Sequence, residues 1–298
     1  MRALLALLAL LSVAPAQAAV SIFACEPEWA ALAQEIGGAD VQVFSATTAR
    51  QDPHHIEARP ALIARLRGAS LLVCTGAELE AGWLPQLLRQ AANGAVQAGQ
   101  PGHLMVADHF QLLEKPQRLD RSQGDVHAAG NPHVHLDPRV LSNAAALVAE
   151  RLALIDPPRA QAYRGRLADF RARLGKAIVR WEQSSTTLIG GKVIAHHKSF
   201  TYLFAWLGIR EVANLEPLPG VPPGAAHLAQ LIAQAPQLGA QMILHAAYQN
   251  PRAARFAAEK TGLPAVELAY TVGGNEAARD LFGLFDDTID RLLRVQRR

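Results

Sequence analysis

The chain has 298 residues, a formal net charge of +3 and a hydrophobic content of 50%. That content supports sizeable hydrophobic cores, and the length suits two domains or one large domain. Lysine and arginine are scattered rather than gathered on one stripe, and only 6% of the residues are aromatic. The composition therefore excludes the basic footprint that is typical of nucleic-acid-binding proteins.

The first 18 residues have the pattern of a secretory signal peptide. Met1-Arg2 is a short basic start, the run from Ala3 to Val13 is apolar, and Ala16-Gln17-Ala18 is typical of a cleavage site. The apolar run is too short to span a membrane, and no later segment approaches the necessary length. We therefore expect cleavage after Ala18 and export to the periplasm as a soluble protein.

Short hydrophobic runs alternate with amphipathic helices in the N-terminal part of the chain, which indicates parallel βαβ units. The expected strands are Val20–Cys25, Val41–Ser45, Leu71–Cys74 and His103–Asp108. The expected helices are Glu28–Ile36, Pro60–Arg67, Leu84–Ala92 and Pro138–Leu154. The polar segment Glu114–Asn131, which contains proline and glycine, predicts a surface loop.

One long amphipathic helix is predicted from Pro158 to Ser184. Its apolar residues recur at steps of three and four, and they are Tyr163, Leu167, Phe170, Leu174, Ile178 and Trp181. A helix of this length spans roughly 40 Å. Its position between two alternating halves indicates a rigid connector, although the same pattern fits a surface helix of a single domain.

The alternation of strands and helices resumes after this helix. The expected strands are Lys192–Ala195, Glu211–Asn214, Gln241–Leu244 and Ala265–Leu268. The expected helices are Phe200–Leu207, Ala225–Ala235, Pro251–Thr261 and Glu276–Leu293. Together these elements predict an α/β fold with two βα lobes, whose mostly parallel sheets are joined by one long rigid helix. We place the N-terminal lobe at residues 19–155, the connecting helix at 156–185 and the C-terminal lobe at 186–298.

Three short stretches contain six of the eleven histidines. They are residues 52–57, 131–138 and 195–200. Each stretch follows an expected strand or precedes an expected helix, and ligands of α/β proteins collect outside the carboxyl ends of strands. Imidazoles from three separate loops suit a borderline-soft divalent ion, Zn²⁺ above all. We therefore predict a metal site with His54, His133 and His197 as ligands.

Other candidate groups are less specific. Glu57 could accept a hydrogen bond from a ligand imidazole and fix its tautomer, or it could be a charge on a helix side. Of the five remaining histidines, His103, His109, His127 and His227 are interpreted as background. His245 ends an expected strand, and a role near the cleft is left open for it. There is no His-Glu-x-x-His helix, Gly-x-Ser-x-Gly elbow or phosphate-binding glycine loop, and no motif supplies a plain carboxylate base. We therefore do not expect an enzyme.

Cys25 and Cys74 each end a strand-like run. In an oxidising compartment they could form a disulfide if their strands are neighbours, and otherwise they would be two buried thiols or soft metal ligands. The sequence does not supply the Cα separation that decides between these readings.

Several motifs in one order resemble a known family. They are Ile36-Gly37-Gly38, Asp52-Pro53-His54-His55-Ile56-Glu57 with Pro60, Gly76 with Glu80 and Trp83-Leu84, Asn131-Pro132-His133-Val134-His135-Leu136-Asp137-Pro138, and His197 with Phe200, Tyr202 and Gly208. In these motifs the chain resembles the zinc and manganese substrate-binding proteins of bacterial ABC transporters, the cluster A-I or ZnuA/TroA-like group. The resemblance implies two lobes joined by a rigid helix, with the metal between them and with His54, His133 and His197 as ligands.

The resemblance has two departures. The family usually adds an Asp or Glu ligand near the C-terminus, but residues 269–275 carry no carboxylate. Water, Glu267, Asp280 or another histidine could take that position. The loop Glu114–Asn131 also lacks the long His/Asp-rich insertion of some zinc-binding members, so an auxiliary metal-collecting loop is not expected.

These observations predict a monomeric periplasmic protein that captures Zn²⁺ and delivers it to an ABC transporter permease. A zinc metallochaperone that loads the site is left open, and no nucleic-acid partner is expected. Three imidazoles without a carboxylate favour Zn²⁺ over Mn²⁺, because the harder ion prefers oxygen ligands. The alternatives are an exported zinc-dependent hydrolase and a manganese-specific binding protein of the same fold.

Overall fold

The computed structural model describes residues 18–116 and 124–296. The expected signal peptide, apart from its last residue, and the C-terminal Arg297-Arg298 lie outside the described residues. Within those two ranges, no helix is both long enough and apolar enough to cross a membrane.

The N-terminal lobe contains a four-stranded sheet with the order β2-β1-β3-β4, in which every pair of neighbours is parallel. Its strands are β1 (Val20–Ala24), β2 (Val41–Ser45), β3 (Leu71–Cys74) and β4 (His103–Met105). Its helices are α1 (Pro27–Gly37), α2 (Pro60–Arg67), α3 (Leu84–Ala91) and α4 (Pro138–Ile155). The predicted parallel sheet is confirmed, but β4 is shorter than expected because Ala107–His109 form a 3₁₀ turn.

The C-terminal lobe contains a second parallel sheet with the order β6-β5-β7-β8. Its strands are β5 (Lys192–Ala195), β6 (Arg210–Asn214), β7 (Met242–Ala246) and β8 (Ala265–Leu268). Its helices are α6 (Thr201–Leu207), α7 (Ala225–Leu238), α8 (Arg252–Thr261) and α9 (Leu281–Gln296). The last helix begins five residues later than predicted. The side chain of Asn275 accepts the backbone N–H groups of Ala277 and Ala278 and holds this segment in a turn, and Asp280 accepts the N–H of Gly283 and caps the helix start.

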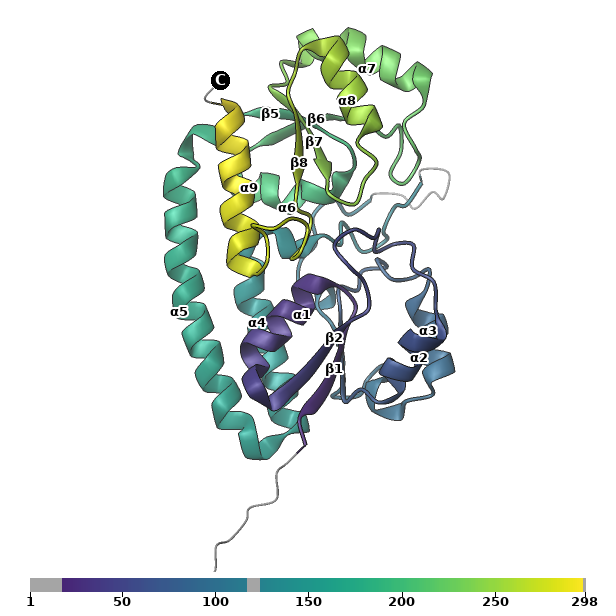
Figure 1. Ribbon diagram of the computed structural model, residues 1–298, viewed down its shortest axis with the longest axis vertical. Coiled ribbons are helices and arrows are strands. Elements are labelled where there is room, and N and C mark those ends of the chain that lie inside the picture. Colours follow the sequence, from purple (N-terminus) through teal and green to yellow (C-terminus); the bar gives the residue numbers. More distant parts are fainter. Residues whose placement is uncertain (1–17, 117–123, 297–298) are drawn as a thin grey trace, which may run out of the picture.

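The long helix α5 (Ala160–Ser184) runs along one side of the molecule, beside both lobes (Figure 1). Its inward face buries Tyr163, Phe170, Leu174, Ala177 and Trp181, which agrees with the periodicity of the sequence. Trp181 packs against Phe285 of α9, with ring centroids 5.0 Å apart. A single hydrophobic cluster includes residues of both sheets and of α5, so the connecting helix is built into a shared core.

A disulfide joins Cys25 and Cys74. These residues lie at the carboxyl ends of the adjacent strands β1 and β3, and their Cα atoms are 4.8 Å apart, within the normal range for a disulfide. Both side chains are fully buried. The structure thus decides in favour of the first of the readings that the sequence left open.

Candidate metal centre

The three predicted ligand histidines come from three different loops. His54 follows β2, and its backbone N–H donates a hydrogen bond to the Asp52 carboxylate at 3.0 Å. His133 lies just before α4, with its N–H bonded to the side-chain oxygen of Asn131. His197 follows β5 directly and precedes a 3₁₀ turn that leads into α6. Short side-chain-to-backbone bonds of this kind set the direction of the first two loops locally.

The fold brings His54, His133 and His197 together. The His54 ring centroid is 5.6 Å from that of His133 and 5.8 Å from that of His197, and the last two are 5.8 Å apart. One ligating nitrogen from each ring lies within 4.8 Å of the other two. All three residues are buried, with His133 only 1% exposed. Separate loops have therefore placed three imidazoles around one point, as the sequence pattern predicted.

Each ring is held through its Nδ1 atom. Nδ1 of His54 bonds to Oδ1 of Asp52 at 2.7 Å, and Nδ1 of His197 bonds to Oε2 of Glu216 at 2.7 Å. A carboxylate at Nδ1 keeps the proton there, so that Nε2 presents a lone pair. Nε2 of His54 is buried and has no hydrogen-bond partner among the described residues. Such a nitrogen is what a metal ion would satisfy.

His133 is held from the other lobe. Its Nδ1 lies 2.7 Å from the hydroxyl oxygen of Tyr270, which belongs to the loop between β8 and α9. The carbonyl oxygen of the same tyrosine accepts a hydrogen bond from Nε2 of His135 at 2.9 Å. Nδ1 of His135 in turn lies 3.2 Å from the fully buried Glu28, which accepts a hydrogen bond from the Thr271 hydroxyl. This network attaches the loop of the C-terminal lobe to the N-terminal lobe directly behind the His133 ring.

The supporting groups differ from the one that the sequence suggested. Glu57 is exposed, and the Nδ1 position of His54 is taken by Asp52 from the same motif. An Asp commonly accepts a hydrogen bond from the backbone N–H two residues later, so the contact between Asp52 and His54 could have been predicted from the local sequence. Glu216 and Tyr270 had no such local signal, because they lie 19 and 137 residues from the rings that they hold.

The two carboxylates suggested for a fourth ligand position lie elsewhere. Glu267 faces Arg50 at 3.7 Å, and Asp280 is exposed and caps the start of α9. A different residue is close to the cluster. His127, which the sequence pattern assigned to the background, has its ring centroid 5.4 Å from that of His54. No spacing rule could have found it, because it reaches the site from the polar loop before α4.

Burial and mutual repulsion keep His133 and His127 neutral. Burial, followed by the charges of His54 and His197, holds the pKa of His133 well below its usual value. The same causes lower the pKa of His127 to about 4. Burial pushes the pKa of Asp52 up, but its hydrogen bond and charge interaction with His54 outweigh this, so the pKa falls below normal. Neutral His133 and His127 beside an ionised Asp52 form a site suited to a cation.

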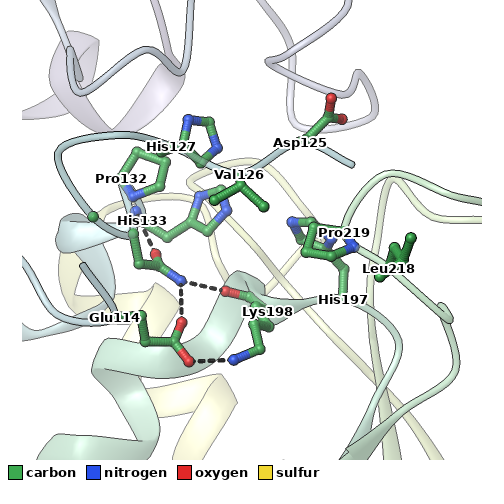
Figure 2. Close-up of a pocket in the computed structure, with 12 residues that line it drawn as sticks. Glu114, Asp125, Val126, His127, Pro132, His133, His197, Lys198, Leu218 and Pro219 are labelled. Atoms are coloured by element: carbon green, nitrogen blue, oxygen red, sulfur yellow. Dashed lines mark hydrogen bonds and ion pairs between the residues drawn. The ribbon is translucent and has the colours of Figure 1, made fainter. Parts of the chain in front are cut away.

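A cavity of about 300 Å³ opens beside the cluster. Figure 2 shows His127, His133 and His197 around it, together with Lys198 and Pro219 from the C-terminal lobe. The ion pair between Lys198 and Glu114, with 2.5 Å between Nζ and Oε1, crosses from one lobe to the other at its edge. The histidine cluster can thus be reached from outside through an opening between the lobes.

Comparisons with known proteins agree with this arrangement. A family model described as ZnuA, "Zinc-uptake complex component A periplasmic", matches residues 22–295. The high-affinity zinc uptake system protein ZnuA of Yersinia pestis is 24% identical over an alignment of 198 residues, with 61% of this chain and 61% of that relative covered.

Two solved structures are similar in fold. A crystal structure of ZnuA has a TM-score of 0.75 at 23% identity, with 92% of this chain and 99% of that chain covered. A ZnuA deletion mutant with zinc bound has a TM-score of 0.74 at 24% identity, with 94% and 96% covered. Because the family model matches nearly the whole described chain, the protein belongs to the ZnuA family, described as component A of a periplasmic zinc-uptake complex.

Proposed function

We propose that this protein captures Zn²⁺ between its two lobes, with Nε2 of His54, His133 and His197 as ligands, and delivers the ion to an ABC importer permease. The observation that carries the proposal is the common geometry of the three rings. Each has its Nδ1 held by another side chain, and one ligating nitrogen from each lies within 4.8 Å of the others. Preset tautomers of this kind are typical of histidine metal ligands.

Zinc is the favoured ion. Neutral imidazole suits Zn²⁺, whereas the harder Mn²⁺ prefers carboxylate and carbonyl oxygen. The carboxylates nearest the three rings, Asp52 and Glu216, bond to Nδ1 atoms and therefore support the ligands. A manganese-specific protein of the same fold would require oxygen ligands in the first coordination sphere instead.

Transport fits the site better than hydrolysis. A zinc hydrolase needs a carboxylate or other base beside a metal-bound water. Asp52 and Glu216 are engaged by the ligand rings and are not free to serve as that base. We therefore infer that the protein performs no covalent chemistry and binds its metal reversibly.

The setting of this function follows from the N-terminus and the family. The signal-like residues 1–18 support export through the inner membrane, cleavage after Ala18 and a periplasmic location. The name of the relative from Yersinia pestis supports a zinc uptake system as the context. We propose that the protein acts as a monomer with a permease as its partner. A metallochaperone would be needed only if free zinc in the periplasm is too scarce to load the site.

Zinc titration of the metal-stripped protein tests the proposal, with a chromophoric chelator as competitor. We expect one tight zinc site in the wild type, its loss in the His54→Ala/His133→Ala/His197→Ala triple variant, and little displacement by manganese. The exposed His109→Ala variant is the matched control and should bind like the wild type. Equal zinc binding by the wild type and the triple variant would refute the site, and manganese preference would refute the choice of metal.

Zinc affinity should also fall as the pH drops through the histidine range, because a protonated imidazole cannot act as a ligand.

A further inference from the structure

The ring of His127 borders the metal site from the polar loop before α4. Its centroid is 5.4 Å from that of His54. It lines the cavity that contains His133 and His197 (Figure 2). It also lines a second cavity, which contains His54. His127 therefore stands in the wall between the two openings that reach the three predicted ligands.

The two ring nitrogens of His127 have unequal surroundings. One hydrogen-bonds to the backbone of Ala77, whereas Nε2 is buried without a hydrogen-bond partner in the described part of the chain. The same division holds for His54, whose Nδ1 is bonded to Asp52 and whose Nε2 is buried and unpaired. A buried polar atom without a partner is costly, and a metal ion would satisfy both nitrogens.

The backbone around His127 is fastened to both lobes. The N–H of Ala128 donates a hydrogen bond to Oε2 of Glu78 at 2.6 Å, and the N–H of Asp125 donates one to the carbonyl of Pro219 at 2.8 Å. Ala77 and Glu78 have φ angles of 49° and 68°, a left-handed conformation that non-glycine residues rarely adopt. Such strain concentrates at functional sites, and here it lies in the turn that receives the His127 segment.

We propose that His127 is the fourth ligand of the metal ion and completes a four-imidazole site. Zinc prefers four ligands in a tetrahedral arrangement, with Zn–N distances of about 2.0–2.1 Å. The four rings would draw together around the ion, and His127 would take the position for which no carboxylate is available. This inference rests on the proposed zinc site and adds the ligand that distinguishes the site from a three-histidine centre with water.

Asp125 is the competing oxygen ligand, since it lines the same cavity as His127. Its carboxylate is exposed and lies 3.8 Å from Nε2 of His55. It has neither the burial nor the fixed orientation of His127, so we assign it no ligand role.

X-ray absorption of the zinc-loaded protein tests this assignment directly. We expect four imidazole nitrogens in the wild type, and three with an added oxygen in His127→Ala. In His127→Cys, a sulfur at about 2.3 Å should replace one nitrogen. The two atoms can be told apart because the Zn–N distance is shorter, about 2.0–2.1 Å. The zinc Kd of His127→Ala should rise at least on the order of 10- to 100-fold, the range found when groups that only support a metal ligand are removed.

His55→Ala is the matched control, because the His55 ring is 6.1 Å from that of His54 and its side chain is 68% exposed. It should keep four imidazoles and the wild-type Kd. Three imidazoles with oxygen in the wild type, and no sulfur in His127→Cys, would overturn the fourth ligand and leave the three-histidine zinc site standing. Loss of that oxygen from the zinc coordination in an Asp125→Ala variant would identify the Asp125 carboxylate as the ligand instead. Failure of the wild type to bind zinc would refute both proposals.

Discussion

The two lobes have the same parallel strand order, with the first strand of each lobe inside its sheet, yet they support their histidines differently. His54 is held by Asp52, two residues away, and His197 by Glu216, from the loop after the neighbouring strand of the same lobe. His133 is held by Tyr270 from the opposite lobe. Two of the three predicted ligand rings are thus oriented within their own lobe, and only the third depends on how the lobes meet.

The two lobes also differ in the covalent support of the strands that lead to the site. The N-terminal lobe places a buried disulfide between β1 and β3, at the ends of the strands that lead to the site. The C-terminal lobe has no such bond, since the structure assigns both cysteines of the chain to that one disulfide. The N-terminal side of the site is therefore reinforced by a covalent bond, whereas the C-terminal side is held by noncovalent contacts. The four predictions below test how the two sides are supported.

The largest effect should come from removing the disulfide. A Cys25→Ala/Cys74→Ala variant should lose roughly 4 kcal/mol of unfolding free energy, because the bond closes a loop of about 50 residues in the unfolded chain. Urea denaturation of the zinc-free protein measures the change. A loss below about 1 kcal/mol would mean that the N-terminal lobe does not depend on its disulfide.

The next largest effect should come from removing the side chains that bond to Nδ1 of His197 and His133. Glu216→Ala should raise the zinc Kd on the order of 10- to 100-fold by freeing the His197 ring. Tyr270→Phe should raise it about tenfold, at the lower end of that range, because a phenol forms a weaker hydrogen bond than a carboxylate. Tyr248→Phe is the control, since its hydroxyl contacts Ser199 and not a ligand ring. If Tyr248→Phe weakened zinc binding as much as Tyr270→Phe, the contact between Tyr270 and His133 would have no special role in orienting the ring.

A smaller effect should appear in the pH dependence of stability. His127 has a pKa of about 4 in the folded state, because burial and then the charges of His54 and His197 disfavour its protonation. Below about pH 6.5 the unfolded chain binds a proton that the folded chain does not. The unfolding free energy of the metal-free protein should therefore fall as the pH drops from about 6.5 towards 4, by at most about 1.4 kcal/mol per pH unit from this group.

Comparison with a His127→Gln variant isolates this contribution. Burial raises the pKa of both Glu80 and Glu211 to about 7, and these groups act in the opposite direction. Their effect is shared by the wild type and the variant and cancels in the difference at each pH. The variant should lose less stability on acidification, and parallel curves would contradict the lowered pKa of His127.

The smallest expected effect is that of Glu57→Gln. The Glu57 side chain is exposed, and Asp52 already occupies Nδ1 of His54. The zinc Kd should therefore remain at its wild-type value, whereas Asp52→Ala should weaken binding in the same range as Glu216→Ala. Weaker zinc binding by Glu57→Gln would instead support the role that the sequence motif suggested, a hydrogen bond from a ligand imidazole to Glu57.

Much of this architecture could be predicted from local patterns. The period-3.6 apolar face of α5 and the alternation around it predict a long helix between two βα units, because burial of one face is recorded in the residue spacing. The three histidine-bearing loops were equally visible, since each follows or precedes a regular element. The start of α9 was misplaced because the capping side chains of Asn275 and Asp280 override the propensity of the residues around them.

The sequence by itself determined the fold class, the two lobes and the three histidines, because these depend on periodicity and on short motifs. Only the tertiary structure decided that Cys25 pairs with Cys74, that Glu216 and Tyr270 orient two of the rings, and that His127 lies against His54. These contacts join residues far apart in the chain. Their geometry is set by the packing of strands, loops and lobes, which leaves no periodic signal in the residues themselves.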